Sequence, residues 1–360
     1  MKTVRHLGFL LLVLAPTYLR GQEANSGIDL RATLTAQLMG SNQLTAEPRS
    51  GSPVIAGSRT IAYPTLKFSE HWFATGAVQL VTRPYYTSNL STEGYGAKGS
   101  VLQSTLNYSR VSRRGSLLVR GGEMSSAFGS FLLRYDDADN ALIDLPPQYG
   151  YYYAPVSFLA VAAAQVDATR GKWDGRLQFA NSSPANPRSI FAHDQYGNWT
   201  AGAGYTVHQG FRIGVSGYRG PYLDRKYAYY YPGEAKPSTL PAHAIGVDAN
   251  WAHRHTSAYL EVQRLVMSYT LFPDFRDSAG YAELRQVLSP RWSIAGRYSL
   301  TSINVTGRTN IVETTGSYRP NCFQLLKFGY ELRHASTGSE RNNNIVAVQY
   351  ITIFHKSAAL

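Results

Sequence analysis

Cysteine is almost missing from this chain of 360 residues, in which Cys322 is the only one. A single cysteine cannot form a disulfide within the chain, so the fold must gain its stability in another way. Long hydrophobic runs are missing as well. The apolar run at residues 7–15 is shorter than the ~20 residues that a membrane helix needs. Together with a negative mean hydropathy, this composition does not fit a bundle of membrane helices.

Acidic residues are in the minority, with 23 Asp and Glu against 35 Lys and Arg and a formal net charge of +12. The basic residues are dispersed along the chain and form no basic tail. A basic surplus suits three partners: nucleic acid, lipid phosphate, or the anions that enter a channel. Export from the cytoplasm argues against nucleic acid, and the first residues indicate export.

The first 22 residues have the pattern of a secretory signal peptide. Lys2, Arg5 and His6 precede the apolar run at residues 7–15, which is too short to cross a bilayer. We expect cleavage near Gly21 and a single domain over residues 23–360, which remains basic without the leader. The alternative is an N-terminal membrane anchor.

Most of the chain alternates apolar and polar residues in stretches of roughly ten. In residues 27–39, one face holds Ile28, Leu30, Ala32, Leu34, Ala36 and Leu38, and the other holds Asp29, Arg31, Thr33, Thr35 and Gln37. A period of two indicates a β-strand with one apolar and one polar face. A soluble sandwich has the same alternation, so the connections between strands must distinguish the two folds.

These connections alternate between short and long. We expect about sixteen strands, near residues 27–39, 58–68, 72–83, 98–110, 115–124, 156–167, 173–182, 197–207, 211–219, 242–251, 256–268, 278–288, 292–301, 308–319, 323–334 and 343–354. Short turns opposite long loops are typical of outer-membrane barrels, and an even strand count puts both termini in the periplasm. The sequence therefore predicts an all-β fold: a closed, antiparallel transmembrane barrel in the cell outer membrane.

Aromatic residues gather beside the short turns. Trp72, Trp173, Trp251 and Trp292 are the tryptophans of this group, and we expect them to form an aromatic girdle at the membrane interface. The last predicted strand ends in Phe354. This ending resembles the C-terminal signature that the barrel-assembly machinery recognises, although residues 355–360 follow it.

The polar face of each strand would line the lumen. The basic residues that we assign to the pore wall are Arg31, Arg120, Arg176, Arg212, Arg285, Arg297, Lys327 and Arg333. Basic candidates outnumber acidic ones on this face, and a basic wall attracts anions. We therefore expect a weak preference for anions.

The longest connection, near residues 125–155, follows the fifth predicted strand. It contains Asp136, Asp137, Asp139 and Asp144 together with apolar residues that argue against disorder. On this loop the chain resembles the general bacterial porins, whose third loop folds into a sixteen-stranded barrel. The resemblance implies that these aspartates form the acidic side of a constriction, opposite the wall arginines, and that a transverse field crosses it.

Several alternatives remain open at this point. The basic lumen is also similar to that of phosphate-selective porins. The tyrosine runs at residues 149–153 and 227–231 could stack sugars, as aromatic tracks do in maltoporin-like channels, although such runs more often pack loops or interfaces. An outer-membrane enzyme or an adhesin on a plugged barrel would not conduct.

No catalytic or metal-binding constellation stands out, so we expect no enzyme activity, no cofactor and no metal. The expected partners are outer-membrane lipid, small hydrophilic solutes and, by analogy with porins, two further copies in a homotrimer.

Overall fold

The structure, a computed structural model, describes residues 26–42, 54–83, 96–149, 156–157, 159–181, 197–222, 231–233, 239–336 and 342–359. The expected signal peptide lies outside these residues. Sixteen strands run through the described part of the chain: β1 (Gly27–Ser41), β2 (Val54–Lys67), β3 (Trp72–Arg83), β4 (Gly96–Ser112), β5 (Gly115–Met124), β6 (Val161–Arg170), β7 (Trp173–Ala180), β8 (Asn198–His208), β9 (Phe211–Pro221), β10 (Pro241–His253), β11 (Thr256–Met267), β12 (Phe275–Val287), β13 (Trp292–Ile303), β14 (Gly307–Asn321), β15 (Gln324–Ala335) and β16 (Asn342–Ala359).

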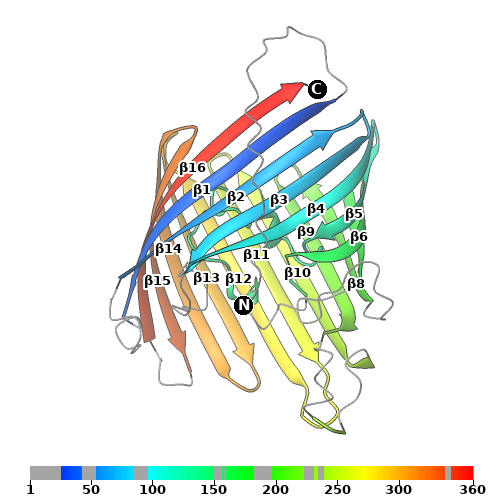
Figure 1. The fold of residues 1–360 in the computed structure, drawn as a ribbon. Helices are drawn as coiled ribbons and strands as arrows, with labels where there is room; N and C mark the ends of the chain where they lie inside the picture. The colour runs from blue at the N-terminus through cyan, green and yellow to red at the C-terminus, as the bar shows by residue number, and fades with distance from the viewer. Residues whose placement is uncertain are drawn as a thin grey trace, which may run out of the picture.

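The strands form one closed antiparallel barrel (Figure 1). Each strand pairs with the strands before and after it in the sequence, and β16 pairs with β1 along the whole of Gly27–Ser41. Closure leaves no unpaired edge strand, which supplies the stability that disulfides cannot give here. The predicted fold class is therefore confirmed.

Connections at one end of the barrel are short. Residues 113–114, 171–172 and 209–210 each join two strands there, whereas the connections at the other end are longer except for residues 304–306. At Gly210 φ is +85°, and a Cβ atom would lie 2.3 Å from the carbonyl oxygen of Ala252, so only glycine fits this turn. The predicted alternation of short and long connections is confirmed.

Two strand boundaries differ clearly from the expected ones. β6 begins at Val161 instead of near residue 156, because Val156 is buried inside the barrel and its carbonyl accepts a hydrogen bond from the Ser126 hydroxyl. β16 continues to Ala359 instead of ending at Phe354, because it pairs with β1 as far as Gly27. Alternation alone cannot reveal either contact.

The inner and outer faces of β1 follow the period of two. Leu30, Leu34 and Leu38 are exposed on the outer wall, whereas Thr33 and Thr35 are buried in the lumen. The other strands repeat this arrangement, so large apolar side chains cover much of the outside of the barrel. An apolar outer wall around a polar interior is the arrangement that a bilayer requires. None of the helices in the described residues is long and apolar enough to cross a membrane.

The four tryptophans of the expected girdle all lie on the outer wall near the short turns. Three of them stand directly opposite a tyrosine on the next strand: Trp72 and Tyr108, Trp173 and Tyr205, and Trp292 and Tyr318, with ring centroids 5.2, 4.7 and 4.6 Å apart. Trp251 instead stacks on His253. Phe354 is also exposed on the outer wall, opposite Ala32. Their roles at an interface and in assembly stay predictions.

The outer wall gives a test of which face meets lipid. Leu34 lies at the middle of β1, so Leu34→Arg should place a charge near the bilayer midplane and lower the free energy of unfolding by about 2–4 kcal/mol. Denaturant titration of the barrel folded into lipid vesicles would measure the loss. Ser112→Arg, at an exposed position beside a short turn, is the control and should cost far less. Equal losses would contradict the assigned faces.

Candidate pore constriction

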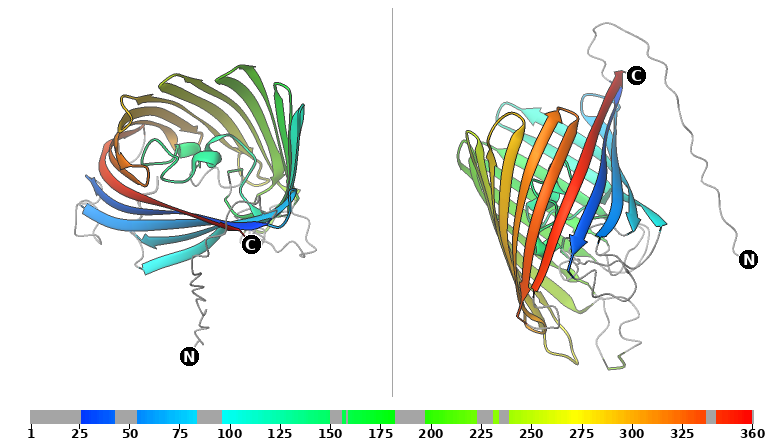
Figure 2. Two further views of the ribbon diagram at one scale, coloured as in Figure 1. Left: turned by 90° about the horizontal axis from the view of Figure 1, so that it is seen from above. Right: turned by 90° about the vertical axis from the view of Figure 1, so that its left-hand side faces the viewer.

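The connection between β5 and β6 folds into the barrel. Its described residues include two short helical turns, η1 (Phe131–Arg134) and η2 (Pro147–Tyr149), which lie within the ring of strands (Figure 2). We call residues 125–149 with 156–157 the inner loop. Phe128, Phe131 and Leu142 have no exposed surface. Burial of these side chains holds the inner loop inside the lumen.

Phe128 packs in a cluster that joins the inner loop to the wall. The buried members of that cluster include Met124, Val156, Tyr218, Ala244 and Leu265. The Phe131 ring packs edge-on against Tyr281 of β12, with the centroids 6.1 Å apart. Apolar contacts therefore reach the wall at β9–β12 inside an otherwise polar lumen.

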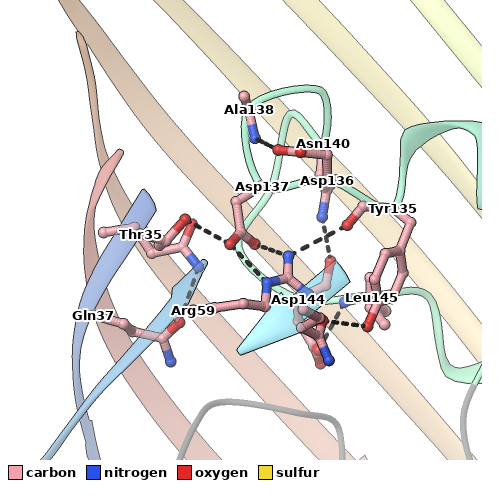
Figure 3. Close-up of polar contacts among 12 residues, drawn as sticks. Thr35, Gln37, Arg59, Tyr135, Asp136, Asp137, Ala138, Asn140, Asp144 and Leu145 are labelled. Carbon is pink, nitrogen blue, oxygen red and sulfur yellow. Dashed lines mark hydrogen bonds and ion pairs between the residues drawn. The ribbon is translucent and has the colours of Figure 1, made fainter. Parts of the chain in front are cut away.

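Asp137 is the most heavily bonded of the predicted acidic residues (Figure 3). Its carboxylate accepts hydrogen bonds from the Thr35 hydroxyl at 2.7 Å and from Arg59 Nε at 3.0 Å, and a second Arg59 nitrogen completes the ion pair. Thr35 lies on β1 and Arg59 on β2, directly opposite each other in the strand register. Asp137 therefore fastens the inner loop to two neighbouring strands.

The two neighbours of Asp137 in the acidic cluster bind the same side of the barrel. Asp136 accepts a hydrogen bond from the Tyr63 hydroxyl at 2.6 Å and one from the Ala138 backbone N–H at 2.8 Å. Asp139 is exposed and pairs with Arg31 of β1 at 3.0 Å. All three carboxylates thus contact β1 or β2 directly.

Asp144 lies in a different part of the lumen, beside β13–β15. Its backbone N–H donates to Glu313 at 3.0 Å, and its carbonyl accepts a hydrogen bond from Arg297 at 2.8 Å. Its carboxylate oxygen is 3.9 Å from Arg333, which itself binds Glu331 at 2.9 Å. The predicted four aspartates are therefore split between two sites on the wall.

Lys327 binds the backbone of the inner loop. Its ammonium donates to the carbonyls of Asp137, Asn140 and Leu142 at 2.6, 2.6 and 3.0 Å. The side chain has no exposed surface, so these three bonds replace its lost hydration. Lys327 therefore shapes the loop and does not line an open channel.

The remaining predicted wall residues face inward with varied partners. Arg212 of β9 binds Asp174 at 2.6 Å and Asp248 at 2.7 Å, and Arg120 of β5 binds Asp167 at 2.8 Å. In further contacts, Arg297 binds Glu313 at 2.5 Å and Arg176 donates to the carbonyl of Gly129 at 2.6 Å. Arg285 lines a cavity beside the inner loop.

Two arginines of the site were absent from the residues expected to form it. Arg59 binds Asp137, and Arg134 of the inner loop donates to Glu283 at 2.6 Å and to the Tyr281 hydroxyl at 3.0 Å. Besides Glu283, a second carboxylate of the wall binds the inner loop: Glu261 accepts hydrogen bonds from Tyr149 at 2.6 Å and from the Ser130 hydroxyl at 3.2 Å. Arg59 shares the inner face of β2 with Ile61 and Tyr63, so period-two alternation gives only a weak signal for it. No comparable signal marks Arg134.

The inner loop places two of its carboxylates in opposite electrostatic settings. Burial alone would raise the pKa of Asp137, but the charges of Arg59 and Lys327 and the hydrogen bonds it accepts outweigh burial and hold that pKa below its ordinary value. Burial raises the pKa of Asp144 well above its ordinary value, and the Glu331 and Glu313 carboxylates add to this shift. The ionised form of Asp137 therefore stabilises the inner loop. In contrast, burial and the neighbouring carboxylates disfavour the ionised form of Asp144.

Within the described ranges, no group of three or more His, Cys, Asp or Glu side chains could hold a metal ion. The tyrosine runs at residues 149–153 and 227–231 lie largely outside those ranges. Tyr149 itself donates its hydroxyl to Glu261 inside the lumen.

Comparison with known proteins shows the same architecture at low sequence identity. No protein-family profile matches the chain, and no curated protein matches it. Among solved structures, an anion-selective porin from Comamonas acidovorans is 10% identical with a TM-score of 0.66, over 91% of this chain and 100% of that one. The outer-membrane channel DcaP of Acinetobacter baumannii is 10% identical with a TM-score of 0.62, over 92% and 99%.

A third solved structure, the trimer form of the outer-membrane protein OmpT of Vibrio cholerae, is 10% identical with a TM-score of 0.58, over 91% of this chain and 99% of that one. The likeness covers nearly the whole of each chain and confirms the expected resemblance to porins in fold. With the apolar outer wall, it indicates an outer-membrane barrel.

Asp137 and Asp144 form a matched pair for mutation. At neutral pH, Asp137→Asn should lower the free energy of unfolding by about 3–5 kcal/mol, because it leaves Arg59 buried without its counter-charge. Asp144→Asn should leave stability unchanged or raise it, because it removes a carboxylate that burial and its neighbours oppose. Urea unfolding of the detergent-folded barrel, followed by tryptophan fluorescence, would measure both.

The two effects should depend on pH in opposite ways. Asp137 contributes stability above the ordinary aspartate pKa, and this contribution is lost as the pH falls through its lower folded pKa. Any gain from Asp144→Asn should be present at neutral pH and vanish in acid, where Asp144 is protonated in both states. Equal losses for both variants at neutral pH would contradict this assignment.

Proposed function

We propose that this protein is an outer-membrane porin that allows passive diffusion of small hydrophilic solutes. One observation carries the proposal: a barrel with an apolar outer wall encloses a polar, charged lumen into which a long loop is folded. A polar lumen in a barrel of this size is the arrangement of a water-filled channel. The likeness to the porins and channels described above supports a channel in preference to an enzyme.

The inner loop is the proposed constriction. It contacts β1 and β2 through Asp136, Asp137 and Asp139, and it contacts β12–β15 through Arg134, Ile143 and the carbonyls that Lys327 binds. A segment attached on both of these sides narrows the lumen between them. The attachments are short ion pairs and hydrogen bonds, so much of the opposing charge is neutralised locally.

The proposed weak anion preference therefore rests on basic groups that carboxylates do not neutralise. Arg176 donates to a backbone carbonyl, and Arg285 lines a cavity that has neither Asp nor Glu among its described lining residues. Fixed charges act over a Debye length of ~8 Å at physiological salt, so unpaired charges near the narrowest section count most. The transverse field inferred from the porin resemblance would arise where loop and wall charges are not in direct contact.

Assembly and maturation belong to the same proposal. The protein would lose residues 1–22 on export, and the barrel-assembly machinery would recognise the end of β16 around Phe354. A homotrimer is the proposed oligomer, on the analogy of porins and of the trimer form named above. No cofactor is proposed.

Planar bilayers provide the direct test. The purified barrel should give large, steady conductance steps, and a salt gradient should give a reversal potential that shows weak anion preference. Absence of any conductance would overturn the porin proposal and favour an adhesin or an enzyme on a plugged barrel. Block by a single sugar class would favour a substrate-specific channel.

The triple variant Asp136→Asn, Asp137→Asn, Asp139→Asn tests the constriction itself. It should raise anion preference and alter conductance, because Arg31 and Arg59 would lose their counter-charges at the inner loop. Asp274→Asn, which removes a carboxylate outside the inner loop, is the control and should change neither. If the triple variant conducts like the parent protein, the constriction lies elsewhere.

A further inference from the structure

Lumen-facing arginines of the wall follow a common rule: most of them pair with a carboxylate. The arginines that do so are Arg31, Arg59, Arg120, Arg212, Arg297 and Arg333. Arg176, which donates to the Gly129 carbonyl, departs from the rule, and so do Arg285 and Arg319. In the part of the chain that the structure describes, neither Arg285 nor Arg319 forms an ion pair with a carboxylate, and Arg319 donates only to the Cys322 carbonyl at 3.5 Å.

Arg285 and Arg319 line the same cavity, at the short-turn end of the barrel beside the inner loop. Its volume is about 60 Å³, and neither Asp nor Glu is among its described lining residues. A single water needs roughly 10–15 Å³ on this measure, so the cavity has room for a small ion. We call it the basic recess.

The barrel wall leaves space for the basic recess because two of its lining side chains, Ser293 and Ser317, are small. Ser293 of β13 and Ser317 of β14 lie opposite each other in the strand register, and Lys327 of β15 lies opposite Ser317. On β12, Val287 lies opposite Ser293, and Arg285 is the next residue along that strand that faces the lumen. On β14, Arg319 is the next lumen-facing residue after Ser317. Arg285 and Arg319 therefore line the recess together with the two serines, and Arg291 of the short turn lines it as well.

The inner loop covers the basic recess with neutral residues. Ala138, Asn140 and Ala141 line it, whereas the carboxylates of Asp137 and Asp139 point to β1 and β2, where Arg59 and Arg31 bind them. The Lys327 ammonium adds positive charge while all three of its hydrogen bonds go to loop carbonyls. The described residues of the inner loop thus place no carboxylate among the residues that line the recess.

We propose that the basic recess is a binding subsite for a small oxyanion such as inorganic phosphate. Each guanidinium offers parallel N–H donors that match two oxygens of such an anion, and the two serine hydroxyls supply further donors. This arrangement recognises a tetrahedral or carboxylate-bearing anion better than chloride, because only the former accepts paired hydrogen bonds. As a solute site in a channel, it rests on the proposed porin function, but binding itself does not depend on conduction.

The test begins with binding of inorganic phosphate to the detergent-folded full chain at low ionic strength, measured by isothermal titration calorimetry. The parent protein should bind phosphate with saturation. The double variant Arg285→Gln, Arg319→Gln should bind at least about tenfold more weakly, because charge-assisted hydrogen bonds are lost. Arg113→Gln with Arg114→Gln removes two exposed charges from a short turn and should change the affinity less than about twofold.

Two further arms keep the outcomes distinct. Arg285→Lys retains the charge without the planar fork and should give an intermediate affinity, provided that heat-modifiable migration shows a folded barrel. Phosphate should also reduce chloride conductance in bilayers of the parent protein but not of the double variant. Absence of saturable phosphate binding, or equal loss in the Arg113/Arg114 control, would overturn the subsite. Binding without any conductance would retain the subsite and overturn the porin proposal.

Discussion

Pairing of β16 with β1 is the constraint on which the other features depend. It joins the two ends of the sheet along the whole of Gly27–Ser41, so that the polar face of each strand is enclosed. Because the ladder is closed, each strand is held in register by two neighbours, and a shift of one residue would turn the lumen side chains of the shifted strand toward lipid. The polar interior therefore exists only as a property of the closed barrel.

Closure also brings charged side chains into a confined lumen, where the inner loop supplies several of their partners. Carboxylates and arginines from distant strands face one another across a confined space, where an unpaired charge is costly. The loop supplies Asp137 to Arg59, Arg134 to Glu283 and backbone N–H groups to Glu313. The charged wall and the folded loop therefore stabilise each other, and the loop is part of the interior as much as any strand.

Much of the fold was predictable because its signals are local. The alternation in β1 and the short turns gave sixteen strands in the right order, and the tryptophans beside the turns lie on the outer wall as expected. Boundaries failed where a distant contact decided them. Val156 leaves β6 for the lumen, and β16 extends past Phe354 because its partner strand does.

The site was predictable only in its composition. The acidic cluster could be found from the sequence. Its partner Arg59, however, shares the inner face of β2 with Ile61 and Tyr63, so the alternation along β2 does not mark this face as the polar one. Arg134 and Glu283 are 149 positions apart, and no local pattern connects them. Such pairs follow from how sixteen strands are arranged around one axis, which single-sequence periodicity does not contain.

The seam between the first and last strands has a consequence for engineering. Gly27 stands opposite Ala359, so the two ends of the barrel sequence lie side by side at the short-turn rim. A brief peptide could join them, and new termini could be opened in one of the longer connections at the opposite rim. Such a circular permutant would keep every ladder while moving the first and last residues to the other side of the membrane.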